Sequence, residues 1–435
     1  MMINVELPIP DRHHLLITIF FIQAPLEGSM HLTAEEERVL EGEAGEAPRF
    51  AMKILVNLGE LEGAEGFVPI RSAHISGVSY HTAGDALIKL LEELHGMGAR
   101  ISVPSSLNPA GMDLERWKEI GYPGDFAEKQ LRIIELYRKL GIDITCSCIP
   151  YETPHRMEPI SFGDHLAWGE SNAVIYANSI VGARTNREGG ISALAAAILG
   201  RTPDYGMHGD ENRYPTLVVN ILGRMDPLHF NLLGAFIGES YNSQVPYFTG
   251  IDIPVVNGDL KQLGAALAAK GGHSIFHVKD LTPEHGFIDI SEREGLISER
   301  ITITTEELEE AKDDLYPPPG RTPDVFVLGC PQFGISEFQR LYRAVKGRKL
   351  RKEKRMIVYT NRALREMLDP TLIPAITASG VEVYDDTCMV VSPLDRLGFS
   401  AVGTDSAKAA HYIPKMSRIP ADLMPLEIMV DLAFE

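Results

Sequence analysis

The feature that most constrains the fold of this 435-residue chain is the regular alternation of helical and strand-like segments from Thr33 onward. Apolar residues recur at helical spacing at 83–95 and 125–140, whereas 99–104 and 142–146 are typical of short strands. Such alternation predicts an α/β protein. Loops rich in Ser, Asn, Cys or Gly follow the strands, and ligands of open α/β sheets bind where strands end.

The alternation continues in the second half of the chain. Its predicted strands lie at 217–222, 274–278, 324–329, 356–360 and 381–384. The run 316–320 contains three consecutive prolines and a glycine, which makes it the best linker candidate. We therefore expect an α/β region at 30–315 and a C-terminal α/β region at 321–435.

Residues 1–29 differ from this pattern. The apolar run 15–22 is too short to cross a bilayer, and it lacks the basic flank and cleavage site of a signal peptide. Thr33 and Glu36 then form a capping-box pattern at the start of a helix predicted over 34–58. We interpret 1–29 as an N-terminal extension or a mis-set start; the alternative is an edge strand or an arm that contacts a partner.

Composition narrows the class of protein. The formal net charge is −19, which argues against a nucleic-acid-binding face because phosphate binding needs basic residues. Hydrophobic residues make up 44% of the chain, enough for a large core. No stretch approaches the roughly 20 apolar residues of a transmembrane helix. We expect a cytoplasmic protein that binds neither membrane nor nucleic acid.

The run 167–186 is unusually rich in short polar side chains. Glu, Ser, three Asn, Arg and Thr lie there among small apolar residues. Asn and Gly are poor helix formers, and packing alone does not require so many polar groups. The run is typical of a wall of hydrogen-bond donors around a small anionic ligand.

The chain has four cysteines: Cys146, Cys148, Cys330 and Cys388. They fit three interpretations, namely buried apolar residues, a disulfide pair or metal ligands. The last three each follow a predicted strand, so their thiols would converge if the strands point the same way. Three thiolates on a four-iron cluster would leave one iron open as a Lewis acid for a leaving hydroxyl. Spacing alone does not establish such a site.

Short motifs in a fixed order give a more specific signal. They run from 32–36 to 412–414 and resemble the aconitase X family of hydro-lyases over nearly all of 30–435. Between these ends the motifs are 72–77, 104–108, 148–151, 170–184, 248–250, His277, 282–284, 329–331, 386–388 and 405–408. Each motif is weak alone, and the order and spacing make the resemblance strong.

The resemblance implies an aconitase-like core of related α/β domains around a central cleft. It also implies an iron–sulfur cluster, of the 4Fe–4S type with one open iron, held by Cys148, Cys330 and Cys388. Cys146 would be an extra thiol nearby, able to replace Cys148 or to form a disulfide when the cluster is lost.

The resemblance also implies a partner and an activity. No segment resembles the swivelling domain that supplies a serine base in this superfamily, so we expect a separate small subunit and a heterodimer. Archaeal members dehydrate (R)-5-phosphomevalonate to trans-anhydromevalonate 5-phosphate, in a modified mevalonate route to isoprenoids. The first alternative is dehydration of cis-3-hydroxy-L-proline or another small hydroxy acid. A non-catalytic RNA- or metal-binding relative is a more distant alternative.

Eliminating water from a 3-hydroxy acid requires carboxylate binding, removal of an α-proton and help for a poor leaving group. The resemblance makes Glu170, Ser171 and Lys408 the catalytic candidates. Glu170 and Ser171 would orient the substrate or relay a proton, unless they only cap a helix. Lys408 would be a point charge for a substrate anion. The substrate-binding candidates are Gly77, Val78, Ser79, Ser106, Asn108, Glu170, Ser171, Arg184, Ser406 and Lys408.

Several of these candidates have structural alternatives. Arg184 would bind a carboxylate or phosphate through two parallel hydrogen bonds, or form a structural ion pair. Ser106 and Asn108 would donate to the substrate or serve as turn residues, and the loop at 77–79 would present backbone amides to an anion. The two histidines in the motifs, at 74 and 277, are more typical of structural groups.

Overall fold

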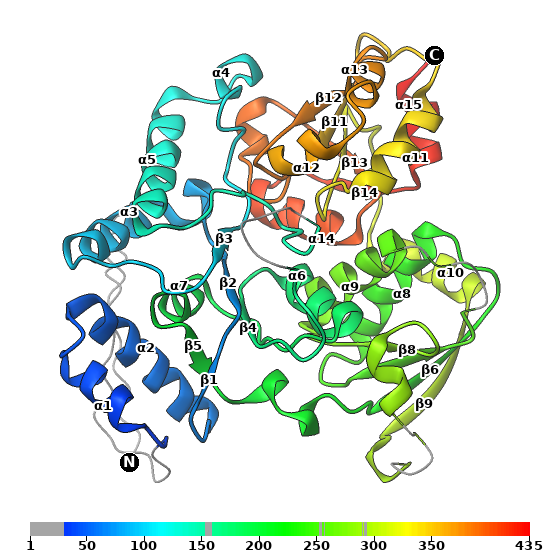
Figure 1. Cartoon of the computed structure of the whole chain (residues 1–435). Helices are drawn as coiled ribbons and strands as arrows, with labels where there is room; N and C mark the ends of the chain where they lie inside the picture. The colour runs from blue at the N-terminus through cyan, green and yellow to red at the C-terminus, as the bar shows by residue number, and fades with distance from the viewer. Residues whose placement is uncertain (1–29, 153–158, 252–254, 256, 289, 291–293) are drawn as a thin grey trace, which may run out of the picture.

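The computed structural model describes residues 30–435 except 153–158, 252–254, 256, 289 and 291–293. The predicted extension at 1–29 therefore lies outside the described residues. Figure 1 shows three groups of elements that follow one another along the chain, with α6 (Ser171–Tyr176) and α14 (Ala407–Ser417) near the centre where the groups meet.

The first group is built on a parallel three-stranded sheet in the order β3-β2-β4. Its strands are β2 (Ser72–Ile75), β3 (Ser105–Leu107) and β4 (Leu166–Trp168). All three are buried along their whole length, as expected for a parallel sheet covered on both faces. A two-stranded antiparallel sheet, β1 (Phe67–Pro69) with β5 (Arg201–Pro203), lies beside it.

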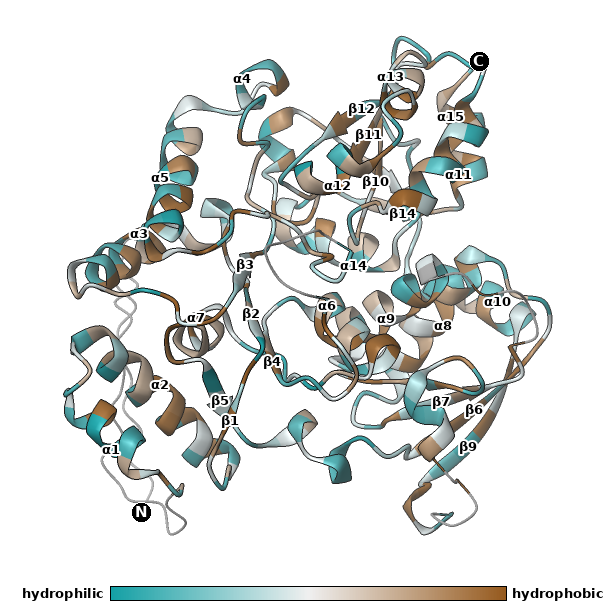
Figure 2. Ribbon diagram, in the orientation of Figure 1, coloured by the Kyte–Doolittle hydropathy of each residue, from teal (hydrophilic) through white to brown (hydrophobic). Residues whose placement is uncertain are grey.

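Helices of the first group surround this sheet. They are α1 (Ala34–Glu41), α2 (Glu46–Glu62), α3 (Tyr80–Gly96), α4 (Trp117–Ile120), α5 (Gly124–Leu140) and α7 (Gly190–Leu199). Of these, α2, α3, α5 and α7 share one apolar core with the sheet. Their apolar residues recur on one side, and Figure 2 shows this side as brown facing inward and teal facing outward. The pattern follows from helical periodicity in the sequence.

The second group has a parallel four-stranded sheet in the order β8-β7-β6-β9. The strands are β6 (Leu217–Leu222), β7 (Pro246–Thr249), β8 (His277–Val278) and β9 (Glu299–Thr304). Its helices are α8 (Pro227–Ser240), α9 (Asn257–Gly271) and α10 (Thr305–Leu315). α8 and α9 approach so closely at Gly234 that an added Cβ would lie 2.5 Å from the carbonyl oxygen of Leu263.

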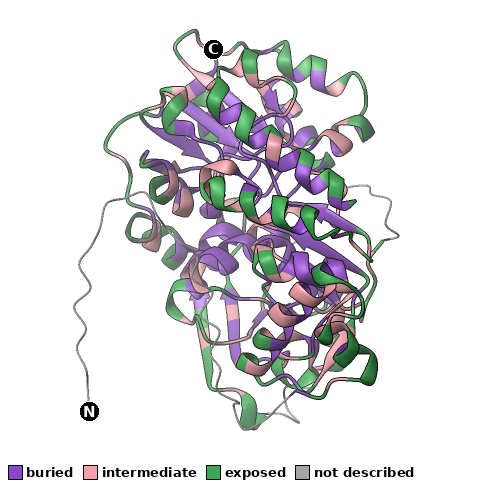
Figure 3. Cartoon of the chain, turned by 90° about the vertical axis from the view of Figure 1, so that its left-hand side faces the viewer, coloured by how far each residue is buried: buried purple, intermediate pink, exposed green. Residues whose placement is uncertain are grey.

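The third group contains a parallel five-stranded sheet in the order β12-β11-β10-β13-β14. The strands are β10 (Val325–Leu328), β11 (Arg355–Tyr359), β12 (Glu382–Tyr384), β13 (Val402–Thr404) and β14 (Ala421–Leu423). Around it lie α11 (Ile335–Val345), α12 (Arg362–Met367), α13 (Leu372–Thr377), α14 and α15 (Leu426–Ala433). Figure 3 shows the strands buried and the outer helix faces exposed.

The architecture confirms the predicted α/β fold, but several predicted elements were wrong. The strand expected at 99–104 is absent from that described stretch, and β3 forms instead in the predicted loop, because Ser105–Leu107 pairs with Ala73–Ile75. The strand expected at 142–146 is a single bridge at Asp143. Next to this bridge, the Thr145 side-chain hydroxyl forms hydrogen bonds with the backbone N–H and carbonyl of Leu107, in place of the backbone bonds of a strand pair.

One predicted helix and one predicted region are each divided in the structure. The single helix expected at 34–58 is two helices, α1 and α2, separated by a turn at Gly42 and Gly45. Both glycines have φ near +100°, which side chains rarely adopt. The region 30–315 contains two separate parallel sheets. Within the described residues, no helix is long and apolar enough to cross a bilayer.

The contact between α8 and α9 gives a test of this packing. Gly234→Ala should destabilise the protein by roughly 1–3 kcal/mol, because the new methyl group overpacks against backbone atoms. The measurement is the midpoint of urea unfolding. Gly124→Ala is the matched control, since an added Cβ there meets nothing within 4 Å. Equal midpoints for both variants would contradict the packing described.

Candidate active site

Most of the predicted site residues, though not Arg184, lie where strands of two parallel sheets end. In the first group, the chain leaves β2, β3 and β4 directly into Gly77, Asn108 and Glu170. In the third group, β10 and β13 lead into Cys330 and Ser406. Because strands of a parallel sheet share one carboxyl edge, each sheet gathers its own set of polar side chains at that edge. Contacts between the two sets make them one site.

A buried ion pair joins the two sets. Lys408, in the first turn of α14, forms a salt bridge with Glu170, which precedes α6. The Lys408 ammonium also donates to Asn172 Oδ1 at 2.7 Å, and Asn108 Nδ2 donates to Glu170 Oε2 at 2.7 Å. All four residues are buried. The charges are thus satisfied by each other and by two amides, as buried charges require.

The pair holds both partners in their charged forms. Burial alone would raise the pKa of Glu170, but Lys408 and the hydrogen bonds from Lys408 and Asn108 bring it below its usual value. Burial alone would lower the pKa of Lys408, and the charge of Glu170 brings it above its usual value. Ser171 lies beside them, with its hydroxyl donating to Glu170 Oε1 at 3.4 Å.

Three cysteine thiols lie close to this ion pair. Cys148, Cys330 and Cys388 are buried and free. Burial raises the pKa of each thiol, to about 12 for Cys330, and the charges of Glu170 and Lys408 act on all three. Cys388 interacts electrostatically with each of the other two. Cys148 thus shares one environment with Cys330, although 182 positions separate the two residues.

Cys146 has a different environment. It packs in the core of the first group, and its thiol interacts electrostatically with Asp386, Arg362 and Arg138 rather than with Glu170 or Lys408. Burial raises its pKa well above the usual value. The structure therefore separates this thiol from the other three.

Two residues that the sequence prediction missed connect the site. Asn172 accepts from Lys408 and donates from Nδ2 to the Cys148 carbonyl at 2.7 Å. Gln332 is fully buried, and its backbone N–H donates to Cys148 Sγ at 3.1 Å. A polar amide two residues after Cys330 was the available signal for Gln332, and Asn172 was inside the polar run noted above.

Other substrate-binding candidates surround the same strand ends. The Ser79 hydroxyl donates to the Val391 carbonyl at 2.8 Å and so ties the first group to the loop after Cys388. Ser106 Oγ lies 2.8 Å from His74 Nδ1. The Ser406 hydroxyl caps α14 and also bonds the Cys330 thiol, lowering the pKa of that thiol.

The loop after β2 is open at Gly77 and buried at Val78. Gly77 has a φ of +73°, and an added Cβ would meet nothing within 4 Å. Val78 is buried, and its carbonyl accepts from Gln130 Nε2 at 3.1 Å.

The structure does not bring Arg184 to this site by any described contact. Its guanidinium forms a salt bridge with Asp210 and donates to the His208 carbonyl at 2.7 Å. Together with Arg213 it lines a separate cavity of about 280 Å³. These contacts fit the ion-pair alternative for Arg184.

The polar run at 167–186 was interpreted too broadly. Its residues form β4, α6 and a π-helical turn (Ala177–Val181). Asn178 Nδ2 donates to the carbonyls of Thr185 and Ser274, and Asn186 Nδ2 donates to that of Tyr205. The later polar residues thus satisfy buried backbone groups, and only the start of the run reaches the ion pair.

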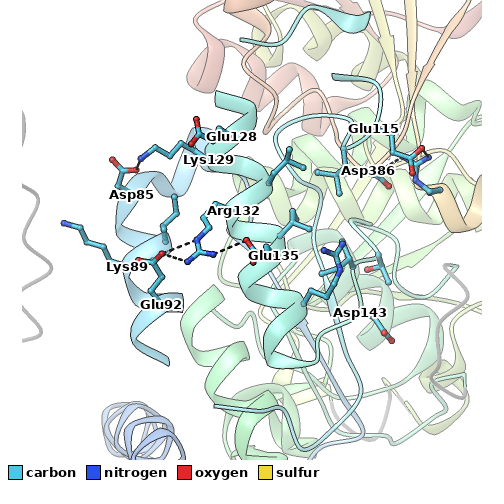
Figure 4. Close-up of a pocket in the computed structure, with 18 of the residues that line it drawn as sticks. Asp85, Lys89, Glu92, Glu115, Glu128, Lys129, Arg132, Glu135, Asp143 and Asp386 are labelled. Carbon is cyan, nitrogen blue, oxygen red and sulfur yellow. Dashed lines mark hydrogen bonds and ion pairs between the residues drawn. The ribbon is translucent and has the colours of Figure 1, made fainter. Parts of the chain in front are cut away.

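A large groove in the described structure lies elsewhere. It has a volume of about 1490 Å³ and lies between α3, α5 and the segment near Asp386 (Figure 4). None of the predicted catalytic or thiol residues lines it. Several of its charged side chains pair with one another, for example Arg132 with Glu92 at 2.7 Å. The volume of this groove therefore does not make it the candidate active site.

Comparison with known proteins agrees with this geometry. The family models of the aconitase X first, second and third domains match residues 29–211, 215–313 and 323–435. The phosphomevalonate dehydratase large subunit of Methanosarcina mazei is 44% identical over 89% of this chain and 93% of that protein. That of Methanothermobacter thermautotrophicus is 43% identical over 91% and 96%. The chain belongs to the aconitase X family.

A solved structure and a more distant relative complete the comparison. The crystal structure of Thermococcus kodakaraensis aconitase X in its holo-form superposes with a TM-score of 0.83 at 36% identity, covering 93% of this chain and 100% of that one. The cis-3-hydroxy-L-proline dehydratase of Pseudomonas aeruginosa is 32% identical, and the match covers 88% of this chain but 66% of that protein.

Lys408→Met should destabilise the protein by about 3–5 kcal/mol, because it leaves the Glu170 carboxylate buried without its counter-charge. The double variant with Glu170→Gln should recover most of that loss. Urea unfolding of the two variants and the parent measures both effects. Equal stability of the single variant and the parent would show that the pair is not buried as described.

His277 gives a second, pH-dependent test. It is buried, and its Nε2–H donates to the Arg213 carbonyl at 2.8 Å, which fits the structural interpretation. Burial lowers its pKa to about 4. The unfolded chain therefore binds a proton between pH 6.5 and 4 that the folded chain does not. The contribution of His277 to the free energy of unfolding is therefore complete above pH 6.5. It is lost as the pH falls toward 4, by up to about 3 kcal/mol.

His277→Gln keeps a donor near Arg213 and removes the titrating group. Its unfolding free energy should fall less steeply between pH 6.5 and 4 than that of the parent. Urea unfolding at several pH values measures the slopes, and identical slopes would contradict the burial of a neutral imidazole.

Proposed function

We propose that this chain is the large, cluster-binding subunit of a phosphomevalonate dehydratase. It would act in a route to isoprenoids by removing water from (R)-5-phosphomevalonate to give trans-anhydromevalonate 5-phosphate. The observation that carries the proposal is the convergence of three free thiols on a buried Glu–Lys pair. Five relatives named phosphomevalonate dehydratase large subunit are 36–44% identical to this chain, whereas two cis-3-hydroxy-L-proline dehydratases are 32% identical.

The donor set fits an iron–sulfur cluster. Three thiols without a disulfide suit iron, and thiolates are the protein ligands of such clusters. Among the described residues, no group of three or more His, Cys, Asp or Glu side chains is arranged to hold a single metal ion. A cluster would differ from a single ion, because each of the three thiolates would bind a different iron. Cys148, Cys330 and Cys388 would hold it as a 4Fe–4S cluster.

The bound cluster would supply a Lewis acid for the departing hydroxyl group. The chain's own residues would do the rest of the positioning. Lys408 and the Asn108 amide hold Glu170 ionised and fixed beside the thiols. Glu170 and Ser171 would orient the substrate or carry a proton, and the open loop at Gly77 would admit an anionic group of the substrate.

The reaction also needs a base for the α-proton. We assign this role to a serine of a separate small subunit, because the relatives are named large subunits. The proton from C2 and the hydroxyl from C3 of the substrate leave together as water, so no oxidant or reductant is required. The partner would close the site over the strand ends.

The test is water elimination followed by NMR, with the chain reconstituted anaerobically with iron and sulfide and combined with its small subunit. (R)-5-phosphomevalonate should turn over, and cis-3-hydroxy-L-proline, the alternative substrate, should not. Cys148→Ala, Cys330→Ala and Cys388→Ala should each reduce turnover by at least roughly a thousandfold, since a metal Lewis acid contributes several kcal/mol.

Cys146→Ala is the matched control, because that thiol lies outside the group of three. It should keep turnover close to that of the parent. Turnover of hydroxyproline instead would refute the substrate, and unchanged turnover in the three cysteine variants would refute the cluster.

A further inference from the structure

Gln332 occupies an unusual position between the cysteine loops. It follows Cys330 by two residues and has no exposed surface. Its side-chain Oε1 accepts from the backbone N–H of Cys148 at 3.1 Å, and its own backbone N–H donates to Cys148 Sγ at 3.1 Å. The loop of one cysteine is therefore bonded twice to the loop of another, although 184 positions separate Gln332 from Cys148.

The amide nitrogen of the same side chain reaches three further carbonyls. Gln332 Nε2 lies 2.9 Å from the oxygen of Thr360, 3.0 Å from that of Thr387 and 3.2 Å from that of Cys146. Thr387 immediately precedes Cys388, and Thr360 follows β11. A primary amide has two N–H groups, so these bonds are shared among the three acceptors.

The second group of elements is fixed to the same point. Lys261, on α9, has almost no exposed surface and lies with its ammonium 3.3 Å from the Gln332 carbonyl. It forms salt bridges with Glu337 of α11 and, at 3.8 Å, with Glu152 beyond Cys148. All three groups of elements thus contact one another around Gln332.

We propose that the Gln332 side chain is a positioning residue that sets the three cysteine loops at a fixed separation before and after the cluster binds. Gln332 would not contact the substrate. It would act on the cluster by fixing the positions of Cys148 and of Thr387, the residue before Cys388. Its acceptor and donor atoms face different loops, so only an amide of this length satisfies all of them at once. The inference rests on the proposed cluster, but its test includes a readout without iron.

The test uses two variants of the full chain. Gln332→Met keeps the length of the side chain and removes every hydrogen bond that the side chain makes, while the backbone bonds to Cys148 and Lys261 remain possible. Gln332→Glu keeps the acceptor for Cys148 and removes the donors to Thr360 and Thr387. Gln130→Met is the matched control, because Gln130 is equally buried and bridges Tyr80, Gly111 and Val78 but no cysteine loop.

The first readout is iron retention. Each chain is reconstituted anaerobically and challenged with a chelator, and iron and sulfide per chain are measured. Outer residues that orient metal ligands typically change metal affinity about 10- to 100-fold, and both Gln332 variants should lose affinity by this factor. The Gln130 variant should retain the cluster as the parent does.

The second readout is the alkylation rate of each cysteine in the iron-free, reduced chain, mapped by mass spectrometry. Cys148 and Cys388 should react at least about tenfold faster in the Gln332 variants, because the loops open locally. In the control both rates should stay within about twofold of the parent. Near-UV circular dichroism checks that each chain is folded.

Two results would overturn the proposal. One is parental iron retention and alkylation rates in folded Gln332→Met and Gln332→Glu chains. The other is an equal loss in Gln130→Met, which would reduce the effect to general destabilisation. If the parent itself binds no iron, the proposed cluster fails, and the alkylation rates still decide the role of Gln332.

Discussion

The buried salt bridge between Glu170 and Lys408 is the interaction on which the site depends. It joins a residue at the end of β4 to one at the start of α14, 238 positions later, and so connects the sheets of the first and third groups. Two buried charges are stable only when each has its partner and its remaining hydrogen-bonding atoms are satisfied. Asn108 and Asn172 meet that need, and Asn172 also holds the Cys148 carbonyl.

Parallel sheets explain how so few residues from so long a chain meet in one place. Every strand of a parallel sheet ends at the same edge, and the loops after β2, β3 and β4 approach those after β10, β12 and β13. The three thiols come from both sides of this junction. The large groove of Figure 4 is lined by paired surface charges and contributes to none of these contacts.

Part of this was predictable from the sequence. The alternating pattern predicted the α/β class, and β6 was placed correctly at 217–222. Cys330 and Cys388 follow β10 and β12 as expected, whereas the strand expected before Cys148 is only a bridge at Asp143, so the meeting of the three thiols depends on tertiary contacts. Strand β3 was missed because its polar residues, Ser105 and Ser106, are buried by pairing with β2, a contact with no signal in local composition.

The remaining features depend on tertiary contacts that one-dimensional patterns do not encode. Arg184 was a reasonable anion ligand by residue type, but a nearby Asp210 engages its guanidinium. Gln332 lies two residues after Cys330, but its residue type alone does not show which loops it bonds, and its role follows from the loops that surround it. Local sequence patterns predict well which types of residue occupy a site. The topology of the sheets determines which particular residues come into contact there.

The central claim is that three thiols from two sheets hold a cluster in which one iron has no protein ligand. The most direct measurement is the Mössbauer spectrum of the full chain reconstituted with iron-57, recorded with and without the candidate substrate. The account predicts one iron whose signal differs from the others and shifts when (R)-5-phosphomevalonate is added. A spectrum of a single mononuclear iron would contradict the proposed cluster. A cluster spectrum that does not change when the substrate is added would contradict the open iron.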